Sequence, residues 1–177
     1  MGFQNTKISL LLLLGPVISV TSHAEVYLNA EQAARIFFPD QTFKRIAVVL
    51  KDDEKSRIEK LSKNSLKSKN LNVLISKEAS FVFMDQVIGK HELITYAVGI
   101  GQDGKIRGVE VLEYRESYGH QIRREVWRKQ FVGKDKKAEL QVGRDIKNLS
   151  GATLSSTHVT DGVRRILHTY EQIKSRL

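Results

Sequence analysis

Apolar side chains recur at helical spacing in some parts of this 177-residue chain and at strand spacing in others. Residues 30–38 are predicted to form a short helix. Asn29 before them is a residue type that favours the N-cap, and Pro39 ends the helix. Residues 43–50, FKRIAVVL, are typical of a strand. Residues 51–70 carry many charges and few apolar positions, which predicts a solvated helix that trails into a loop.

The apolar period changes to two between residues 71 and 115. The runs LNVLI, SFVFMDQVIGK, ITYAVGI and KIRGVEVLEYR are rich in β-branched and aromatic residues, and turn residues separate them. One of these turns, residues 102–105, has Asp-Gly at its centre, which is typical of a hairpin. No segment of helix length lies between the runs, so we expect an antiparallel meander.

The last third of the chain is predicted to contain two helical segments separated by a loop. Residues 121–131 have apolar side chains at helical spacing, and residues 133–143 are typical of a loop. Residues 156–176 form a longer amphipathic pattern, with Ser155 or Ser156 as the expected N-cap. Taken together, the elements predict an α+β fold, a twisted antiparallel sheet with packed helices.

The first 24 residues have the pattern of a secretory signal peptide. A polar start with Lys7 precedes the charge-free run Ile8–Val20, and Ser-His-Ala at residues 22–24 forms a small-x-small cleavage site. We therefore expect one domain over residues 25–177, exported to the periplasm, with association to the cytoplasmic membrane left open. An uncleaved anchor is the alternative, although the apolar run is short for a membrane span. The chain has no Cys, so packing must stabilise it without disulfides.

Basic residues outnumber acidic ones, and the formal net charge is +9. Such a balance favours acidic partners, anionic lipid headgroups or phosphate-bearing ligands. The basic end of residues 51–70 lacks interleaved aromatic residues, and an exported protein meets little nucleic acid. We therefore predict a solvated surface there and no nucleic-acid partner.

Three patterns resemble known sites, but their context speaks against each. Residues 99–104 spell G-x-G-x-x-G, yet a strand is expected after the last glycine, where a dinucleotide fold needs a helix. Ser156, His158 and Asp161 lie on one predicted helix and point in different directions, so they cannot align as a catalytic triad. The histidines show no metal-ligand spacing, and no cysteine supports them.

A stretch rich in hydroxyl groups, residues 148–163, leads into the last predicted helix. Gly151 and Ala152 remove bulk just before Thr153, so that another molecule can approach its hydroxyl group. The free amide groups and the dipole at the helix start would favour an anion there, such as a phosphate. An ordinary capping loop has the same composition and is the simpler alternative.

The segment SGATLSS, residues 150–156, resembles the flavinylation motif of the FMN-binding domain family. That family includes NqrC- and RnfG-type subunits of ion-pumping respiratory complexes and stand-alone exported proteins. Residues 108–134 resemble the family's preceding block, with a Glu-(Ser/Thr)-x-Gly turn, a Trp and an F-x-G-K element. In this family the motif threonine carries FMN through a phosphoester, which an ApbE-type flavin transferase forms with FAD as donor and a divalent metal. By this resemblance, FMN is the cofactor and Thr153 is its attachment residue.

The expected flavin contacts come from two segments and two single residues. They are Ser150, Gly151, Ala152, Leu154 and Ser155 around Thr153, Glu116, Ser117, Tyr118 and Gly119 in the preceding turn, and Trp127 and Lys134. Glu116 or Ser117 can meet the polar edge of the flavin ring, and the lack of a side chain at Gly119 lets the backbone approach it. Tyr118 and Trp127 can stack on the ring, the alternative for Trp127 being a place in the core.

Charge near the phosphate is the second part of this expected site. Lys134 and Arg144 can offset the phosphate charge, although plain solvation is the alternative for both. One position departs from the family's pattern: Lys147 stands where an Asp usually precedes the motif serine by three residues, and the nearest acid is Asp145. If that Asp helps the transferase to recognise its target, FMN attachment here is less efficient, or FMN binds without a covalent bond.

The chain shows no nucleophile paired with a base, so the function predicted from the sequence is an exported electron carrier rather than an enzyme. Its expected partners are the flavin transferase and a redox partner in the membrane or envelope. Two alternatives remain. One is a flavin-free exported binding module whose basic surface engages anionic lipid or an acidic partner. The other is an oxidoreductase acting on a small substrate.

Overall fold

The computed structural model describes residues 25–115 and 119–177. The expected signal peptide, residues 1–24, therefore lies outside the described residues, and so do three of the expected flavin contacts, Glu116, Ser117 and Tyr118. Within the described residues, no helix is both long and apolar enough to cross a membrane.

In the part of the chain that the structure describes, six strands form one antiparallel sheet in the order β1-β6-β5-β4-β3-β2. Their bounds are β1 (Glu25–Val26), β2 (Phe43–Val49), β3 (Asn70–Ser76), β4 (Phe81–Ile88), β5 (Leu93–Ile100) and β6 (Ile106–Tyr114). The meander expected between residues 71 and 115 is confirmed, because β3 to β6 follow one another in the sheet as they do in the chain. The tight turn around Gly104 (φ 77°) joins β5 to β6, so a strand and not a helix follows the G-x-G-x-x-G pattern.

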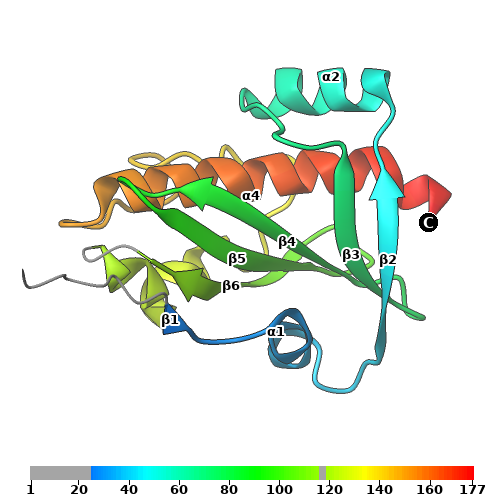
Figure 1. The fold of residues 1–177 in the computed structure, drawn as a ribbon, viewed down its shortest axis with the longest axis horizontal. Helices are drawn as coiled ribbons and strands as arrows, with labels where there is room; N and C mark the ends of the chain where they lie inside the picture. The colour runs from blue at the N-terminus through cyan, green and yellow to red at the C-terminus, as the bar shows by residue number, and fades with distance from the viewer. Residues whose placement is uncertain (1–24, 116–118) are drawn as a thin grey trace, which may run out of the picture.

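Helices cover both faces of the sheet (Figure 1). Their bounds are α1 (Ala30–Phe37), α2 (Asp52–Ser62), α3 (Glu125–Arg128) and α4 (Thr153–Ile173), with short 3-10 turns η1 (His120–Arg123), η2 (Lys129–Phe131) and η3 (Lys174–Arg176). Helix α1 packs on one face, α4 runs along the other, and α2 packs against α4 (Figure 1). The predicted α+β fold is therefore confirmed.

Helix α1 begins as the sequence predicts, with Asn29 as N-cap in a capping box with Gln32. It buries its small face, Ala30, Ala33 and Ala34, against apolar residues of the sheet. Gly99 and Gly108 lie opposite each other on β5 and β6, and a Cβ atom at either position would lie within 2.5 Å of the Phe37 ring. This pair of glycines therefore forms the flat surface on which the end of α1 rests.

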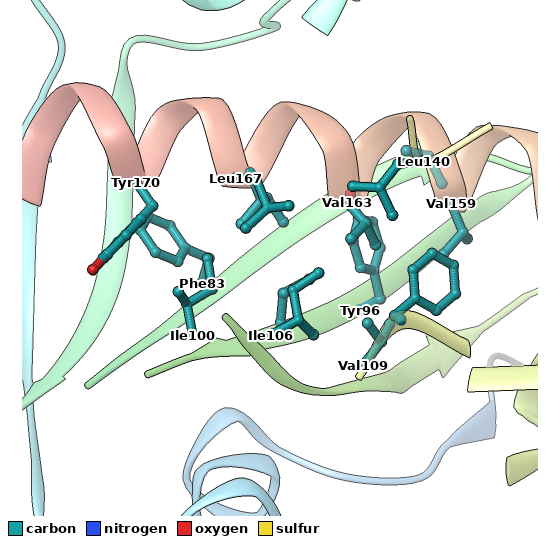
Figure 2. Packing of buried hydrophobic residues seen from close by; sticks show 14 of the residues in the cluster. Phe83, Tyr96, Ile100, Ile106, Val109, Leu140, Val159, Val163, Leu167 and Tyr170 are labelled. Atoms are coloured by element: carbon teal, nitrogen blue, oxygen red, sulfur yellow. The ribbon is translucent and has the colours of Figure 1, made fainter. Parts of the chain in front are cut away.

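Helix α4 buries its apolar stripe against the other face of the sheet (Figure 2). Val159, Val163, Leu167 and Tyr170 point down onto β4, β5 and β6, which is the face that the periodicity of the sequence predicts. Gly162 permits the close approach, since a Cβ atom there would lie 2.0 Å from the hydroxyl oxygen of Tyr96.

Two helix predictions need correction. Residues 121–131 do not form one helix but the short segments η1, α3 and η2, because Arg124 has an extended backbone (φ −60°, ψ 124°) that interrupts the helical hydrogen bonds. Helix α4 begins at Thr153 rather than Ser156, and its N-cap is Ala152 rather than Ser155 or Ser156. The positive φ of Gly151, 80°, turns the chain directly into the helix, so the hydroxyl residues expected in a loop occupy its first turn.

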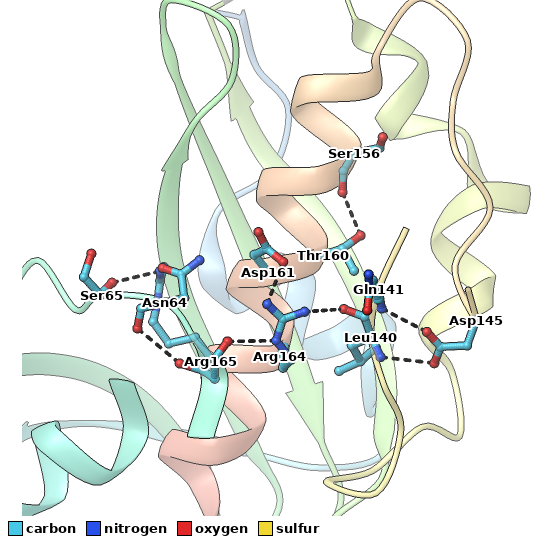
Figure 3. A network of polar contacts seen from close by, with 11 residues as sticks. Asn64, Ser65, Leu140, Gln141, Asp145, Ser156, Thr160, Asp161, Arg164 and Arg165 are labelled. Carbon is cyan, nitrogen blue, oxygen red and sulfur yellow. Dashed lines mark hydrogen bonds and ion pairs between the residues drawn. The ribbon is translucent and has the colours of Figure 1, made fainter. Parts of the chain in front are cut away.

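A buried ion pair fixes α4 relative to the sheet and to the segment after α2. Arg165 lies 2.5 Å from the Asp85 carboxylate on β4, and the Tyr96 hydroxyl group donates to the same carboxylate at 2.8 Å. Arg165 also donates to the side chain of Asn64 and to the carbonyl oxygen of Ser65 (Figure 3). Burial raises the pKa of the Tyr96 hydroxyl group well above its ordinary value, and the charge of Asp85 adds to this, so it stays a hydrogen-bond donor.

Candidate functional site

Thr153 is the first residue of α4, and its side chain is exposed. The first helical hydrogen bond runs from the N–H of Ser156 to the carbonyl oxygen of Ala152, at 2.8 Å. The N–H groups of Thr153, Leu154 and Ser155 thus precede the helical ladder, and the N-cap Ala152 offers no side-chain acceptor for them. An anion bound at Thr153 would meet free amide groups and the positive end of the helix dipole.

Burial distinguishes Thr153 from the hydroxyl groups that follow it. The side chain of Ser156 has no exposed surface, and that of Ser155 is buried as well. The Ser155 hydroxyl oxygen lies 3.5 Å from that of Tyr114, and the Ser156 hydroxyl group donates to the carbonyl oxygen of Thr153 at 3.0 Å. Thr157, one turn further along, is half-buried. Of these four hydroxyl groups, only that of Thr153 is freely accessible to another protein.

Asn148 lies beside the Thr153 hydroxyl group. Its side-chain N–H donates to Thr153 Oγ1 at 3.3 Å, and its carbonyl oxygen accepts from the Ser156 hydroxyl group at 3.2 Å. One amide therefore links the exposed hydroxyl of Thr153 to a buried one. In the sequence, Asn148 opens only a short N-x-S glycosylation pattern that chance explains, and no role at this site was expected for it.

Gly119 and Gly151, both expected flavin contacts, bring separate segments together behind Thr153. Gly119 (φ 93°) lies so close to the start of α4 that a Cβ atom there would be 2.6 Å from Tyr114 Oη and 3.2 Å from Ser155 Oγ. Beside Gly151 lies the side chain of Gln121, whose carbonyl oxygen is buried without a hydrogen-bond partner among the described residues. Gly119 and Gln121 therefore lie beside the hydroxyl-rich motif, although the residues are far apart in the chain.

Trp127 is placed in the core, which was the alternative to stacking on the flavin. It is 3% exposed, packs edge-to-face on Phe131, and donates from its ring N–H to the carbonyl oxygen of Lys147 at 2.9 Å. The side chain of Gln130 accepts from the N–H of Lys147 at 2.8 Å. The peptide groups on both sides of Lys147 are thus held by the segment after β6, while the Lys147 side chain is exposed.

Lys134 contacts an acidic residue rather than Thr153. Its ammonium group lies 3.0 Å from the Asp145 carboxylate, which also accepts from the N–H groups of Leu140 and Gln141. Asp145 therefore organises the loop before the motif (Figure 3). Arg144 is exposed on the same loop.

The Asp145 carboxylate should make the stability of this loop pH-dependent. Burial raises the pKa of this carboxyl group, but hydrogen bonds from Gln141, Lys134 and Leu140 outweigh that effect and hold the pKa below its ordinary value. Because the folded-state pKa is lowered, the stabilisation is complete above the unfolded pKa of about 4 and is lost as the pH falls through the lower folded-state value.

We therefore expect Asp145→Asn to reduce the free energy of unfolding by about 1–2 kcal/mol at pH 7, because charged hydrogen bonds are replaced by neutral ones. The difference from the wild-type protein should shrink below about pH 4. Urea unfolding at a series of pH values measures both effects. Asp40→Asn, at an exposed position, is the control and should change stability little at any pH. A pH-independent loss in the Asp145 variant would contradict this account.

A groove of about 960 Å³ extends from Thr153 along α4. Its α4 wall consists of residues one or two turns apart on one face: Thr153, Thr157, Asp161, Arg164 and His168. Leu61 and Lys63, at the end of α2, line the opposite side together with the loop residues 138–139 and 141–143. Its volume is at the upper end of the range typical of sites for small molecules and cofactors.

Arg164 joins the walls of this groove. Its guanidinium group donates to the carbonyl oxygen of Ser62 at 2.9 Å, to that of Leu140 at 2.6 Å, and to the Asp161 carboxylate at 2.7 Å (Figure 3). Burial lowers the pKa of His168, and the nearby charge of Arg164 lowers it further, so His168 is neutral at neutral pH. The α4 wall of the groove is thus fixed and polar, and it carries the neutral imidazole of His168 at the end away from Thr153.

Sequence reasoning did not find this groove, but a signal for it was present. The polar residues of α4 recur every three or four positions from Thr153 to His168, which marks a second face opposite the apolar stripe. A pattern of this kind usually marks a solvated helix face. Only the position of α2 and of the loop after η2 makes it the wall of a groove.

Comparison with known proteins relates this part of the chain to a known domain. The sequence model of the FMN-binding domain matches residues 89–168. This range includes β5, β6, the loop between η2 and α4, and most of α4. The G component of the Na⁺-translocating ferredoxin:NAD⁺ oxidoreductase complex of Acetobacterium woodii is 32% identical over 84 residues. That match covers 42% of this chain and only 41% of the relative.

The fold also resembles a solved structure. The crystal structure of Shewanella oneidensis NqrC superposes with a TM-score of 0.56 at 15% identity, over 80% of this chain and 86% of that one. At this identity the likeness concerns the fold alone. The resemblance to an FMN-binding domain of the NqrC/RnfG type, inferred from the motif, is therefore confirmed, and with it FMN as the cofactor.

Proposed function

We propose that this chain is an electron-transfer flavoprotein that carries FMN bound covalently, by a phosphoester, to Thr153. One observation supports this most directly. The exposed hydroxyl group of Thr153 lies at the start of α4 and lines a groove large enough for a cofactor, whereas the exposed Ser150 precedes the helix and is not among the lining residues. The neighbouring hydroxyl groups of Ser155 and Ser156 are buried and hydrogen-bonded, so they are poor acceptors.

The residues around Thr153 suit a phosphate. The N–H groups at the start of α4 and the helix dipole favour a negative charge there, and the side-chain amide of Asn148 adds another donor. Lys134 is engaged by Asp145, so the phosphate is held by neutral donors rather than by this lysine. A phosphodiester carries one negative charge, and uncharged donors suffice to stabilise it at a helix start.

The groove suits the rest of the cofactor. Its polar wall on α4 can hydrogen-bond the ribityl chain through Thr157 and Asp161, while Leu61 and Val142 offer apolar contact to a ring. Arg164 holds both walls in place, which keeps the cofactor's orientation constant. FMN supplies the redox chemistry, and the protein retains and orients it.

Placement and partners belong to the same proposal. The signal-peptide pattern of residues 1–24 supports export, with residues 25–177 as the mature domain in the periplasm. A flavin transferase of the ApbE type would attach the cofactor. The similarity to a component of an oxidoreductase complex supports a redox partner in the membrane or envelope. Covalent attachment suits an exported protein, because the cofactor cannot diffuse away.

Protein purified from its native envelope provides the test. We expect a yellow protein whose intact mass exceeds that of the chain from Glu25 by one FMN phosphoester, with peptide mapping that assigns the addition to Thr153. N-terminal sequencing checks the start at Glu25. A colourless protein without added mass would instead support the flavin-free binding module. A yellow protein that loses its colour on denaturation would limit the proposal to non-covalent binding, and Lys147→Asp should then restore the bond.

A further inference from the structure

We infer that Asn148 is a positioning residue for flavin attachment: its side-chain amide orients the Thr153 hydroxyl group for phosphoryl transfer and then contacts the ester phosphate. This inference rests on the proposed function, since it concerns the same acceptor hydroxyl. It assigns a role to a residue outside the SGAT motif.

The hydrogen bonds of Asn148 define its orientation. The side-chain carbonyl oxygen accepts from Ser156, whose side chain has no exposed surface, and the side-chain N–H donates to Thr153 Oγ1. The single hydroxyl proton of Ser156 is shared between Asn148 Oδ1, at 3.2 Å, and the carbonyl oxygen of Thr153, at 3.0 Å, so the Asn148 amide is tied to the buried first turn of α4. Asn148 therefore connects a rigid, buried group to an exposed one.

The backbone of Asn148 is also held in place. The preceding residue, Lys147, is fixed on both sides, through its N–H by the side chain of Gln130 and through its carbonyl oxygen by the buried ring of Trp127. The position of the Asn148 side chain is thus set by the protein core rather than by a flexible loop. Such support is what a group needs to hold a reacting atom in one geometry.

The hydrogen bond from Asn148 to Thr153 Oγ1 bears directly on the chemistry of attachment. In the transfer, Thr153 Oγ1 forms a bond to the FMN-side phosphorus of FAD while the bond from that phosphorus to the AMP oxygen breaks. AMP leaves, and the hydroxyl proton passes to solvent by way of the transferase. The N–H of Asn148 occupies one lone pair of Oγ1 and fixes its rotamer, so the remaining lone pair points out of the protein.

After the transfer, the same N–H would face the phosphodiester, because Thr153 Oγ1, which lies 3.3 Å from Asn148 Nδ2, becomes the ester oxygen. Asn148 would then hold the phosphate as a hydrogen-bond donor. The Lys147 side chain is exposed, and the contact made by Asn148 does not depend on it.

The test compares variants of the full chain as acceptors for a purified ApbE-type transferase with FAD and Mg²⁺. Asn148→Asp keeps the size and the acceptor oxygen for Ser156 but removes the donor, and Asn148→Ala removes both. Asn72→Asp, an exposed asparagine on β3, is the charge-matched control. Initial rates of covalent labelling are measured against acceptor concentration by flavin fluorescence on denaturing gels.

We expect both Asn148 variants to lower kcat for labelling about tenfold or more, with KM for the acceptor protein nearly unchanged, because positioning and not docking is lost. Asn72→Asp should behave as the wild type. Circular dichroism and the thermal midpoint identify any variant that does not fold, and Ser156→Ala, which leaves Asn148 free to rotate, then provides a second test with an intermediate rate. Wild-type kcat in folded Asn148 variants would overturn the inference.

A second readout is independent of the rate. In protein labelled to completion, the ³¹P resonance of the phosphodiester should shift in Asn148→Asp and remain unchanged in Asn72→Asp. An unchanged resonance in Asn148→Asp would overturn the contact with the phosphate. Failure of the proposed function is distinguishable from both outcomes, because the wild-type protein itself would then acquire no flavin at Thr153.

Discussion

Thr153→Ala should abolish covalent flavin attachment while leaving the fold intact. Thr153 is exposed at the first position of α4, where its side chain contributes little packing and its loss should change stability by no more than about 0.5 kcal/mol. The hydroxyl groups of Ser155 and Ser156 cannot replace it because they are buried, and the exposed Ser150 lies before the start of α4. Co-expression with a flavin transferase, followed by denaturing electrophoresis under ultraviolet light, measures the loss.

Two variants act as controls for this result. Ser175→Ala removes an exposed hydroxyl group in η3, after the other end of α4 and outside the groove, and should be labelled as the wild type is. Thr153→Ser keeps a hydroxyl group and should be labelled more slowly, since serine lacks the methyl group that restricts the rotamer of threonine. Fluorescence that survives denaturation in Thr153→Ala, or FMN mapped to another hydroxyl group, would refute the assignment.

The largest loss of stability is expected for Arg165→Met. The side chain of Arg165 is 7% exposed and that of Asp85 is 27% exposed. Removing the guanidinium group leaves the Asp85 carboxylate without its ion-pair partner. Breaking a buried pair in this way costs about 3 kcal/mol. The segment at Asn64 and Ser65, next to the groove wall formed by α2, would also lose its contact with α4.

Urea unfolding of three variants separates this effect from a general effect of charge. Asp85→Asn in the Arg165→Met background removes the uncompensated charge and should recover part of the stability. Arg57→Met breaks an exposed pair with Asp53, whose side chains are 62% and 57% exposed, and should cost less than about 1 kcal/mol. An Arg165→Met protein as stable as Arg57→Met would show that the buried pair contributes little.

Only part of the candidate site was predictable from the sequence. The motif identified Thr153. Gly119 was expected to contact the same cofactor, and the structure places it next to Ser155, two residues after Thr153. The role of Trp127 was not predictable, because the sequence alone does not show which residue an aromatic ring contacts. Its ring N–H binds the carbonyl oxygen of Lys147, twenty positions away, and this contact depends on how the two segments pack.

The sequence by itself determined the local elements of this protein: the capped helix after Asn29, the alternating strands, the hairpin before Lys105, the apolar stripe of the last helix, and the motif around Thr153. These are properties of short segments, since capping, alternation and helical periodicity act within a few residues. The tertiary structure decided which hydroxyl groups are buried, that Asn148 contacts Thr153, and that α2 turns the polar face of α4 into a groove. The burial and the groove join residues that are distant in the chain, and the contact of Asn148 with Thr153 depends on Gln130 and Trp127, which hold the neighbouring Lys147. All of them exist only once the apolar faces of the sheet and helices have packed together.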